Sequence, residues 1–145
     1  MFHRNSWLMN TKKILVVDDS LVIVKVLTLK LKSAGYEVIN APDGATAVAT
    51  ARQHKPDLII LDINFPLEVD QSWDAFSIMQ WIRRIDGAAQ IPVIIITSGD
   101  PAQFKERSLA AGAIAFFHKP IDHDALVATI QKTLGETGVQ AQPTA

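Results

Sequence analysis

The sequence predicts an α/β fold in which helices cover both faces of a five-stranded parallel sheet. Three short runs are continuously apolar, at residues 14–17, 58–61 and 93–96. A strand with one face in solvent alternates apolar and polar residues, whereas a strand buried in a parallel sheet does not. Segments with helical spacing separate the strands, and this alternation is typical of a sheet built by right-handed crossovers.

The residues at the ends of the helical segments support this reading of the chain. Asp19 or Ser20 can cap the first helix, and Pro56 follows the second, where it disfavours further helical residues. Pro101 suits the first turn of the fourth helix, and Gly135 ends the last one. Strands and helices are expected in strict alternation, strand first: 14–17, 20–34, 36–41, 44–54, 58–61, 74–84, 93–96, 101–111, 113–118 and 122–134.

Length and composition limit the class of protein. The 145 residues suit one domain, expected at 12–135 between an N-terminal extension (1–11) and a flexible C-terminal tail (136–145). A net charge of -1 argues against a nucleic-acid-binding surface, and the absence of cysteine excludes disulfides and thiol chemistry. No apolar run reaches the ~18 residues of a membrane span. We therefore expect a cytoplasmic protein whose partners include neither nucleic acid nor a membrane.

Chemically useful side chains follow the strands at the edge where open α/β sheets bind ligands. Three carboxylates at one edge repel one another, so a lysine and a divalent cation are expected to compensate. An all-oxygen site suits Mg²⁺, and a carboxylate beside a metal and an ammonium group can attack phosphorus. Each residue alone could be a cap or a turn residue, which does not explain the whole set: Asp18, Asp19, Asp62, Thr97 and Lys119.

These motifs resemble the receiver domain of bacterial two-component response regulators, the CheY-like family. The resemblance covers residues 12 to about 134 and rests on four motifs and one short run: 13–20, 55–62, 91–98, 111–113 and Lys119-Pro120. It implies a doubly wound, flavodoxin-like fold with strand order 2-1-3-4-5. It also implies a protein that is not an enzyme, apart from catalysing its own phosphorylation and dephosphorylation.

The resemblance assigns the phosphoacceptor and the metal ligands. Asp62 would accept a phosphoryl group from the phosphohistidine of a sensor histidine kinase or of a histidine phosphotransfer protein. Asp19 and Asp62 would bind Mg²⁺ directly, and Asp18 would hold a metal-bound water molecule. The backbone carbonyl of Asn64 would be a further ligand.

The resemblance also implies a switch and a docking surface. Lys119 would pair with the phosphoryl group, and its bond to the following proline would be cis. Thr97 would move toward the phosphoryl group and Phe116 would rotate inward behind it. Leu21 or Val22, in an apolar run that cannot all face the core, is expected to be partly exposed and to dock the partner's helices.

The expected function is a single-domain response regulator or phosphorelay shuttle that acts on an unknown output protein. A pseudo-receiver that binds without phosphorylation is the alternative, and a haloacid-dehalogenase-type phosphatase is disfavoured because Asn64 replaces the acid it needs. The long loop at 67–73 is interpreted as a tolerated insertion, with altered partner access as the alternative. Gly99 occupies a position that tunes the phosphate lifetime in the family. Met79 and Trp81 are expected to be packing residues.

Overall fold

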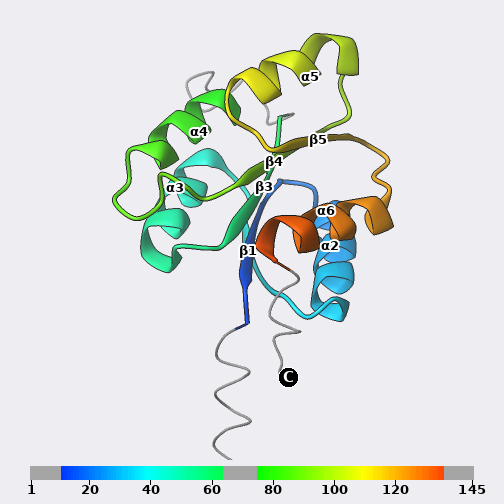
Figure 1. Cartoon of the computed structure of the whole chain (residues 1–145), viewed down its shortest axis with the longest axis horizontal. Helices are drawn as coiled ribbons and strands as arrows, with labels where there is room; N and C mark the ends of the chain where they lie inside the picture. Colours follow the sequence, from blue (N-terminus) through cyan, green and yellow to red (C-terminus); the bar gives the residue numbers. More distant parts are fainter. Residues whose placement is uncertain (1–10, 64–74, 136–145) are drawn as a thin grey trace, which may run out of the picture.

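The computed structural model describes residues 11–63 and 75–135 of the chain. Its strands form a central layer with helices on both sides (Figure 1). Strands and helices alternate along the described chain as the sequence predicts. The elements are β1 (Lys13–Val17), α2 (Leu21–Ser33), β2 (Glu37–Ala41), α3 (Gly44–His54), β3 (Leu58–Asp62), α4 (Ala75–Arg83), β4 (Val93–Thr97), α5 (Pro101–Ala110), β5 (Ala115–His118) and α6 (His123–Leu134).

The sheet has the order β2-β1-β3-β4-β5 and every pair of neighbouring strands is parallel, which confirms the predicted fold class. Two strands are shorter than predicted because their first residues belong to turns. The N–H of Tyr36 donates to the carbonyl of Leu31, and the N–H of Ala113 donates to that of Ser108. These bonds close the ends of α2 and α5, so pairing of β2 and β5 begins at Glu37 and Ala115.

Polar side chains cap the helices that begin at the carboxyl edge of the sheet. Ser20, rather than Asp19, caps α2: its side chain accepts a hydrogen bond from the N–H of Ile23. Aspartates cap three further helices, α3, α5 and α6, in the same way. Such caps satisfy N–H groups that have no partner within the helix. None of the described helices combines the length and the apolar character needed to cross a lipid bilayer.

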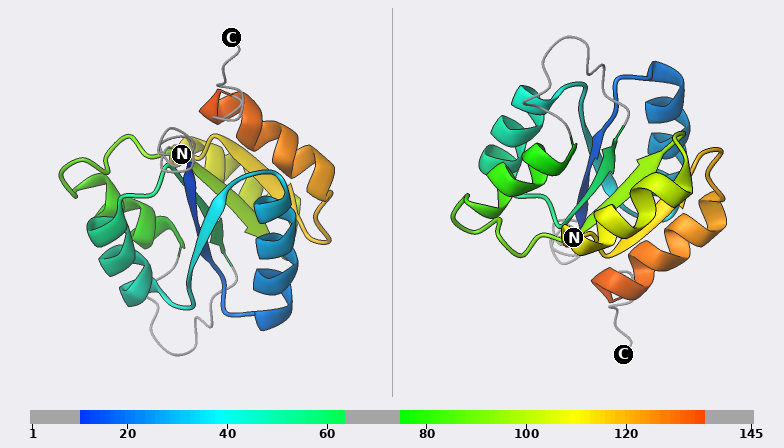
Figure 2. Two further views of the ribbon diagram at one scale, coloured as in Figure 1. Left: turned by 90° about the horizontal axis from the view of Figure 1, so that it is seen from below. Right: turned by 90° about the horizontal axis from the view of Figure 1, so that it is seen from above.

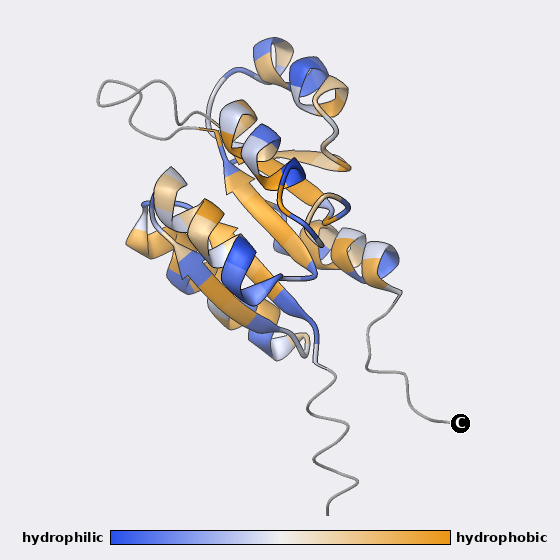
Figure 3. Cartoon of the chain, turned by 90° about the vertical axis from the view of Figure 1, so that its left-hand side faces the viewer, coloured by the Kyte–Doolittle hydropathy of each residue, from blue (hydrophilic) through white to orange (hydrophobic). Residues whose placement is uncertain are grey.

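Helices lie on both sides of the sheet (Figure 2), whose strands are mostly hydrophobic (Figure 3), and a hydrophobic core fills the space on each side. Alternate residues of the central strands face opposite sides. The α3–α4 core lies under α3 and α4 and also receives Phe104 and Phe116, whereas the α2–α6 core lies under α2 and α6. All residues of β3 and β4 are buried, and each fully buried Leu or Ile contributes ~1.5–3 kcal/mol.

Helix α4 shows where a prediction from spacing is wrong. Met79 is 2% exposed and packs in the α3–α4 core, as predicted, but Trp81 is 47% exposed. The buried stripe of α4 runs through residues 78, 79 and 82, so position 81 faces outward. Arg83 donates to the carbonyl of Ile91 at 2.8 Å, and burial lowers the pKa of its guanidinium.

Candidate functional site

Three carboxylates meet at the carboxyl edge of the sheet. Strand β1 pairs with β3 in the register Val17 to Leu61, so the next residues, Asp18 and Asp62, lie side by side. One oxygen from each of Asp18, Asp19 and Asp62 lies within 4.8 Å of the others. Asp18 and Asp62 are buried, at 1% and 2% exposure, while Asp19 is exposed. The predicted acidic cluster therefore exists, and we call these three residues the acidic triad.

Lys119 provides the positive charge next to the acidic triad. Its Nζ lies 3.3 Å from Oδ2 of Asp18 and 3.4 Å from Oδ2 of Asp62. The backbone N–H of Lys119 donates to the carbonyl of Thr97 at 2.8 Å, and the bond to Pro120 is cis, as the resemblance implied. Three carboxylates and one ammonium group leave two formal negative charges at this edge.

This charge and donor set fit a divalent cation. Oδ1 of Asp18 accepts the N–H of Ser20 at 2.9 Å and Oδ2 faces Lys119, so both oxygens of this carboxylate have partners. No cation within the described part of the chain is in ion-pair distance of Asp19. A hard cation prefers carboxylate oxygens, and two uncompensated charges match its own. Asn64, the fourth expected ligand, lies outside the described residues.

The two expected switch residues lie on one face of the sheet. Thr97 ends β4, is fully buried, and its Oγ1 accepts the N–H of Gly99 at 2.9 Å. Phe116 pairs in register with Ile95, two residues before Thr97, so both side chains are on the α3–α4 side. Phe116 is partly buried there. The structure thus brings an aromatic ring and a buried hydroxyl to neighbouring strands.

Gly99 has a packing constraint that the sequence does not reveal. A Cβ atom added at this position would lie 2.8 Å from Cε2 of Phe104 and 3.3 Å from Oγ1 of Thr97. Real Cβ atoms do not approach other heavy atoms this closely, so the ring would have to move. Phe104 therefore closes the space that the missing side chain of Gly99 leaves beside Thr97. No local pattern could have identified this contact, because it depends on how α5 packs.

An apolar surface lies beside Lys119. Leu21 and Val22 are 80% and 72% exposed, so the prediction that the start of α2 is exposed is confirmed. Val26 and Leu29 are exposed one and two turns later, and we call these four residues the α2 patch. A pocket of about 250 Å³ joins the patch to the turn between β5 and α6; its lining includes Val22, Val26 and Lys119.

Comparison with known proteins agrees with this geometry. Residues 14–131 match the family described as the response regulator receiver domain. The chain is 32% identical over 125 residues to the polar-differentiation response regulator DivK of Brucella anthropi, covering 86% of this chain and 98% of that protein. It is 34% identical over 125 residues to the DNA-binding dual master transcriptional regulator RpaA of Synechocystis sp.. That match covers 86% of this chain but only 50% of RpaA.

Solved structures show the same architecture. The chemotaxis protein CheY4 of Vibrio cholerae superimposes with a TM-score of 0.75 at 31% identity, over 86% of this chain and 99% of that one. The receiver domain of the sensor histidine kinase PA1611 from Pseudomonas aeruginosa gives a TM-score of 0.75 at 28% identity, over 86% and 98% of the two chains. In that structure a magnesium ion is coordinated in the active site cleft.

Proposed function

Since the chain belongs to the response regulator receiver domain family, we propose that it is a phosphorylation switch whose Asp62 accepts a phosphoryl group. One observation carries the proposal: Lys119 Nζ lies 3.4 Å from Oδ2 of Asp62, a member of the acidic triad. A buried carboxylate beside an ammonium group and two further acids suits attack on phosphorus better than a structural role, because its charge is costly to bury.

The proposed reaction is transfer from a phosphohistidine. An oxygen of Asp62 attacks the phosphorus, the P–N bond breaks, and the imidazole leaves as the acyl phosphate forms. Lys119, already beside Asp62, would pair with a phosphoryl oxygen. We propose that the acidic triad holds Mg²⁺, with the carbonyl of Asn64 as a further ligand; when bound, this ion neutralises charge on the transferring group. We propose no catalysis by this chain beyond its own phosphorylation and dephosphorylation.

Thr97 and Phe116 are the proposed switch. A phosphoryl group on Asp62 would attract the hydroxyl of Thr97, which now accepts a hydrogen bond from Gly99. Movement of Thr97 would vacate space on the face that Phe116 shares, and the ring would fill it. Support comes from the register of β4 and β5 and from the partial burial of Phe116.

The partner that supplies the phosphoryl group is proposed to dock on the α2 patch. The four apolar side chains, with the pocket beside Lys119, form a surface that leads to the phosphoacceptor. An amphipathic helix that carries a histidine fits such a surface. The apolar residues of that helix recur every three or four residues, which is also the spacing of Val22, Val26 and Leu29 along α2. We propose a sensor histidine kinase or a histidine phosphotransfer protein as this partner, and a second, unidentified protein as the output.

We further propose that residues 12–135 form the receiver domain and that the protein is cytoplasmic. The pseudo-receiver remains the second candidate, and it predicts normal partner binding without phosphorylation. The retained triad and Lys119 favour the switch, because a pure binding module gains nothing from burying two carboxylates. A phosphatase of the haloacid-dehalogenase type is third, since position 64 carries an amide rather than an acid.

Intact mass spectrometry tests the proposal. The full chain is incubated with a small phosphodonor and Mg²⁺, with and without a chelator. We expect the mass of one phosphoryl group to be added, to require Mg²⁺, and to be absent from Asp62→Asn but present in the control Asp124→Asn, an exposed acid of α6. Failure of every donor to label the folded chain would leave the pseudo-receiver, and turnover of added phosphoesters would indicate the phosphatase.

A further inference from the structure

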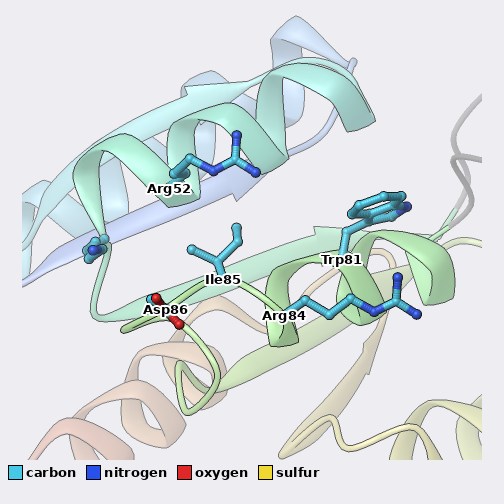
Figure 4. Close-up of a pocket in the computed structure, with 6 residues that line it drawn as sticks. Arg52, Trp81, Arg84, Ile85 and Asp86 are labelled. Carbon is cyan, nitrogen blue, oxygen red and sulfur yellow. The ribbon is translucent and has the colours of Figure 1, made fainter.

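A second pocket lies far from the acidic triad, between the ends of α3 and α4. It encloses about 440 Å³ and is lined by Arg52, Lys55, Trp81, Arg84, Ile85 and Asp86. Helices of a crossover run opposite to the strands, so the C-terminal ends of α3 and α4 lie at the amino edge of the sheet. Figure 4 shows Arg52 extending from α3 and Trp81 from the neighbouring α4, with Arg84, Ile85 and Asp86 in the turn that follows that helix.

The pocket carries an excess of uncompensated positive charge. Three of its side chains are cationic and one is acidic, which leaves two formal positive charges. Within residues 11–63 and 75–135, no carboxylate lies in ion-pair distance of Arg52, Lys55 or Arg84. The neighbouring Arg83, in contrast, is bonded to a backbone carbonyl. Three cations at one concave surface suit an anion, and the planar guanidinium of arginine matches the geometry of a phosphate group.

Lys55 is held in the pocket by unusual backbone geometry. It is the C-cap residue that follows α3, with φ 43° and ψ 67°, a left-handed conformation that is uncommon for a residue other than glycine. Its side chain lies along Gly87: a Cβ atom added there would be 3.3 Å from the Lys55 Nζ. Non-glycine residues in this region cost free energy and persist where the surrounding structure fixes them. The conformation directs the ammonium group toward the residues that follow α4.

Trp81 gives the pocket an aromatic surface. The residue is 47% exposed, and the guanidinium of Arg84 lies over the ring at 5.4 Å from the centroid. An exposed indole next to arginine is a platform on which a planar base can stack. Ile85 is buried and supplies an apolar contact, and the exposed Asp86 can accept a hydrogen bond from an amino group.

We propose that this pocket binds a purine nucleoside phosphate. The base would stack on Trp81 with Asp86 accepting from a ring or exocyclic N–H, and the phosphate would lie between Arg52, Lys55 and Arg84. The volume is within the range of about 300–1,000 Å³ that small-molecule sites occupy. Because the site is at the opposite edge of the sheet from Asp62, it does not depend on phosphorylation, and the two proposals can fail separately.

Fluorescence of Trp81 tests the proposal directly. The chain has three tryptophans, so replacing Trp7 and Trp73 by phenylalanine leaves Trp81 as the single emitter in an otherwise complete protein. We expect saturable quenching by AMP or GMP, weaker binding of inorganic phosphate, and still weaker binding of adenosine. Calorimetry on the unaltered chain should give the same order of affinities, and Asp62→Asn should bind AMP or GMP as the parent does.

Charge-removing variants assign the phosphate contacts. Arg52→Gln and Arg84→Gln should each weaken nucleotide binding about tenfold or more, since hydrogen bonds to charged groups are the strong ones. The matched control is Arg107→Gln in α5, an exposed arginine that also lies over an aromatic ring, that of Phe76 at 4.0 Å. It should change affinity less than about twofold. Equal binding of phosphate and nucleotide, unchanged affinity in Arg52→Gln, or no quenching at millimolar nucleotide would each overturn the proposal.

Discussion

Lys119 is the residue whose removal tests the electrostatics of the site most sharply. Lys119→Met keeps the length and apolar stem of the side chain and removes only the ammonium group. Its neighbours Asp18 and Asp62 then stay buried, at 1% and 2% exposure, and each loses an ammonium group that lies 3.3 or 3.4 Å from its Oδ2. We expect the variant to fold but to be clearly less stable when divalent ions are absent.

The ion-pair distances set the size of the effect. Unit charges at 3.3 and 3.4 Å attract by ~2.5 kcal/mol in total at the dielectric constant of bulk water, and by about four times that at an effective value of 20. Desolvation offsets part of the larger figure, and breaking buried pairs typically costs ~3–5 kcal/mol. Asp19 is exposed, so solvent reaches one side of the acidic triad and weakens the ion pairs. We therefore expect the free energy of unfolding to fall by about 3 kcal/mol, at the lower end of this range.

Urea unfolding measures this loss. The unfolding is monitored by circular dichroism, once in the presence of a chelator and once in excess Mg²⁺. A bound divalent ion replaces the missing charge, so the difference between Lys119→Met and the parent should fall below about 1 kcal/mol in Mg²⁺. The control Lys25→Met, an exposed lysine of α2, should stay within about 0.5 kcal/mol of the parent under both conditions.

Two outcomes would refute this reasoning. If Lys119→Met matches the parent in chelator, the ion pairs contribute nothing and the carboxylates are not electrostatically strained. If the loss occurs but Mg²⁺ does not reduce it, the acidic triad does not hold the ion. The double variant Lys119→Met/Asp62→Asn shows whether the loss of stability comes from charge repulsion or from altered packing. If repulsion is the cause, removal of one carboxylate should restore part of the stability.

Two further predictions concern the α2 patch and Gly99. Val22→Asp should slow phosphoryl transfer from the partner's phosphohistidine about tenfold, by placing a charge in the docking surface, while labelling by a small phosphodonor stays unchanged; the control is Leu109→Asp, an exposed leucine of α5. Equal slowing with both donors would show damage to the site instead. Gly99→Ala should destabilise the fold by ~1–3 kcal/mol in urea, because its Cβ would lie 2.8 Å from the ring of Phe104. Adding Phe104→Leu should recover most of that loss, and an unaltered midpoint in Gly99→Ala would show that the ring moves freely.

The sequence predicts the fold and the acidic triad because both depend on local patterns. Continuous apolar runs specify buried strands, and parallel strands necessarily bring their carboxyl ends to one edge. Asp18 follows β1, Asp62 ends β3 and Lys119 follows β5, so all three lie at that edge. The strand order came from the family resemblance, since periodicity cannot distinguish one order of parallel strands from another.

The features that the sequence does not predict depend on packing between elements. Trp81 has the spacing of a core residue, yet it lies one position off the buried stripe of α4 and is half exposed. The contact of Phe104 with Gly99 and the position of Lys55 along Gly87 join segments that no local motif relates. The predicted start of β5 at residue 113 is also wrong, because a hydrogen bond between Ala113 and the end of α5 competes with strand pairing.

The fully buried central strands divide the interior into two compartments that share no side chains. Phe116 belongs to the compartment under α3 and α4, whereas the α2 patch lies over the other. On the proposed function, movement of the Phe116 ring would therefore take place on the opposite side of the sheet from the surface proposed to bind the phosphoryl donor. With this arrangement, the surface that an output protein recognises could change while the surface that binds the phosphoryl donor stays the same. The two binding surfaces would then be free to evolve independently.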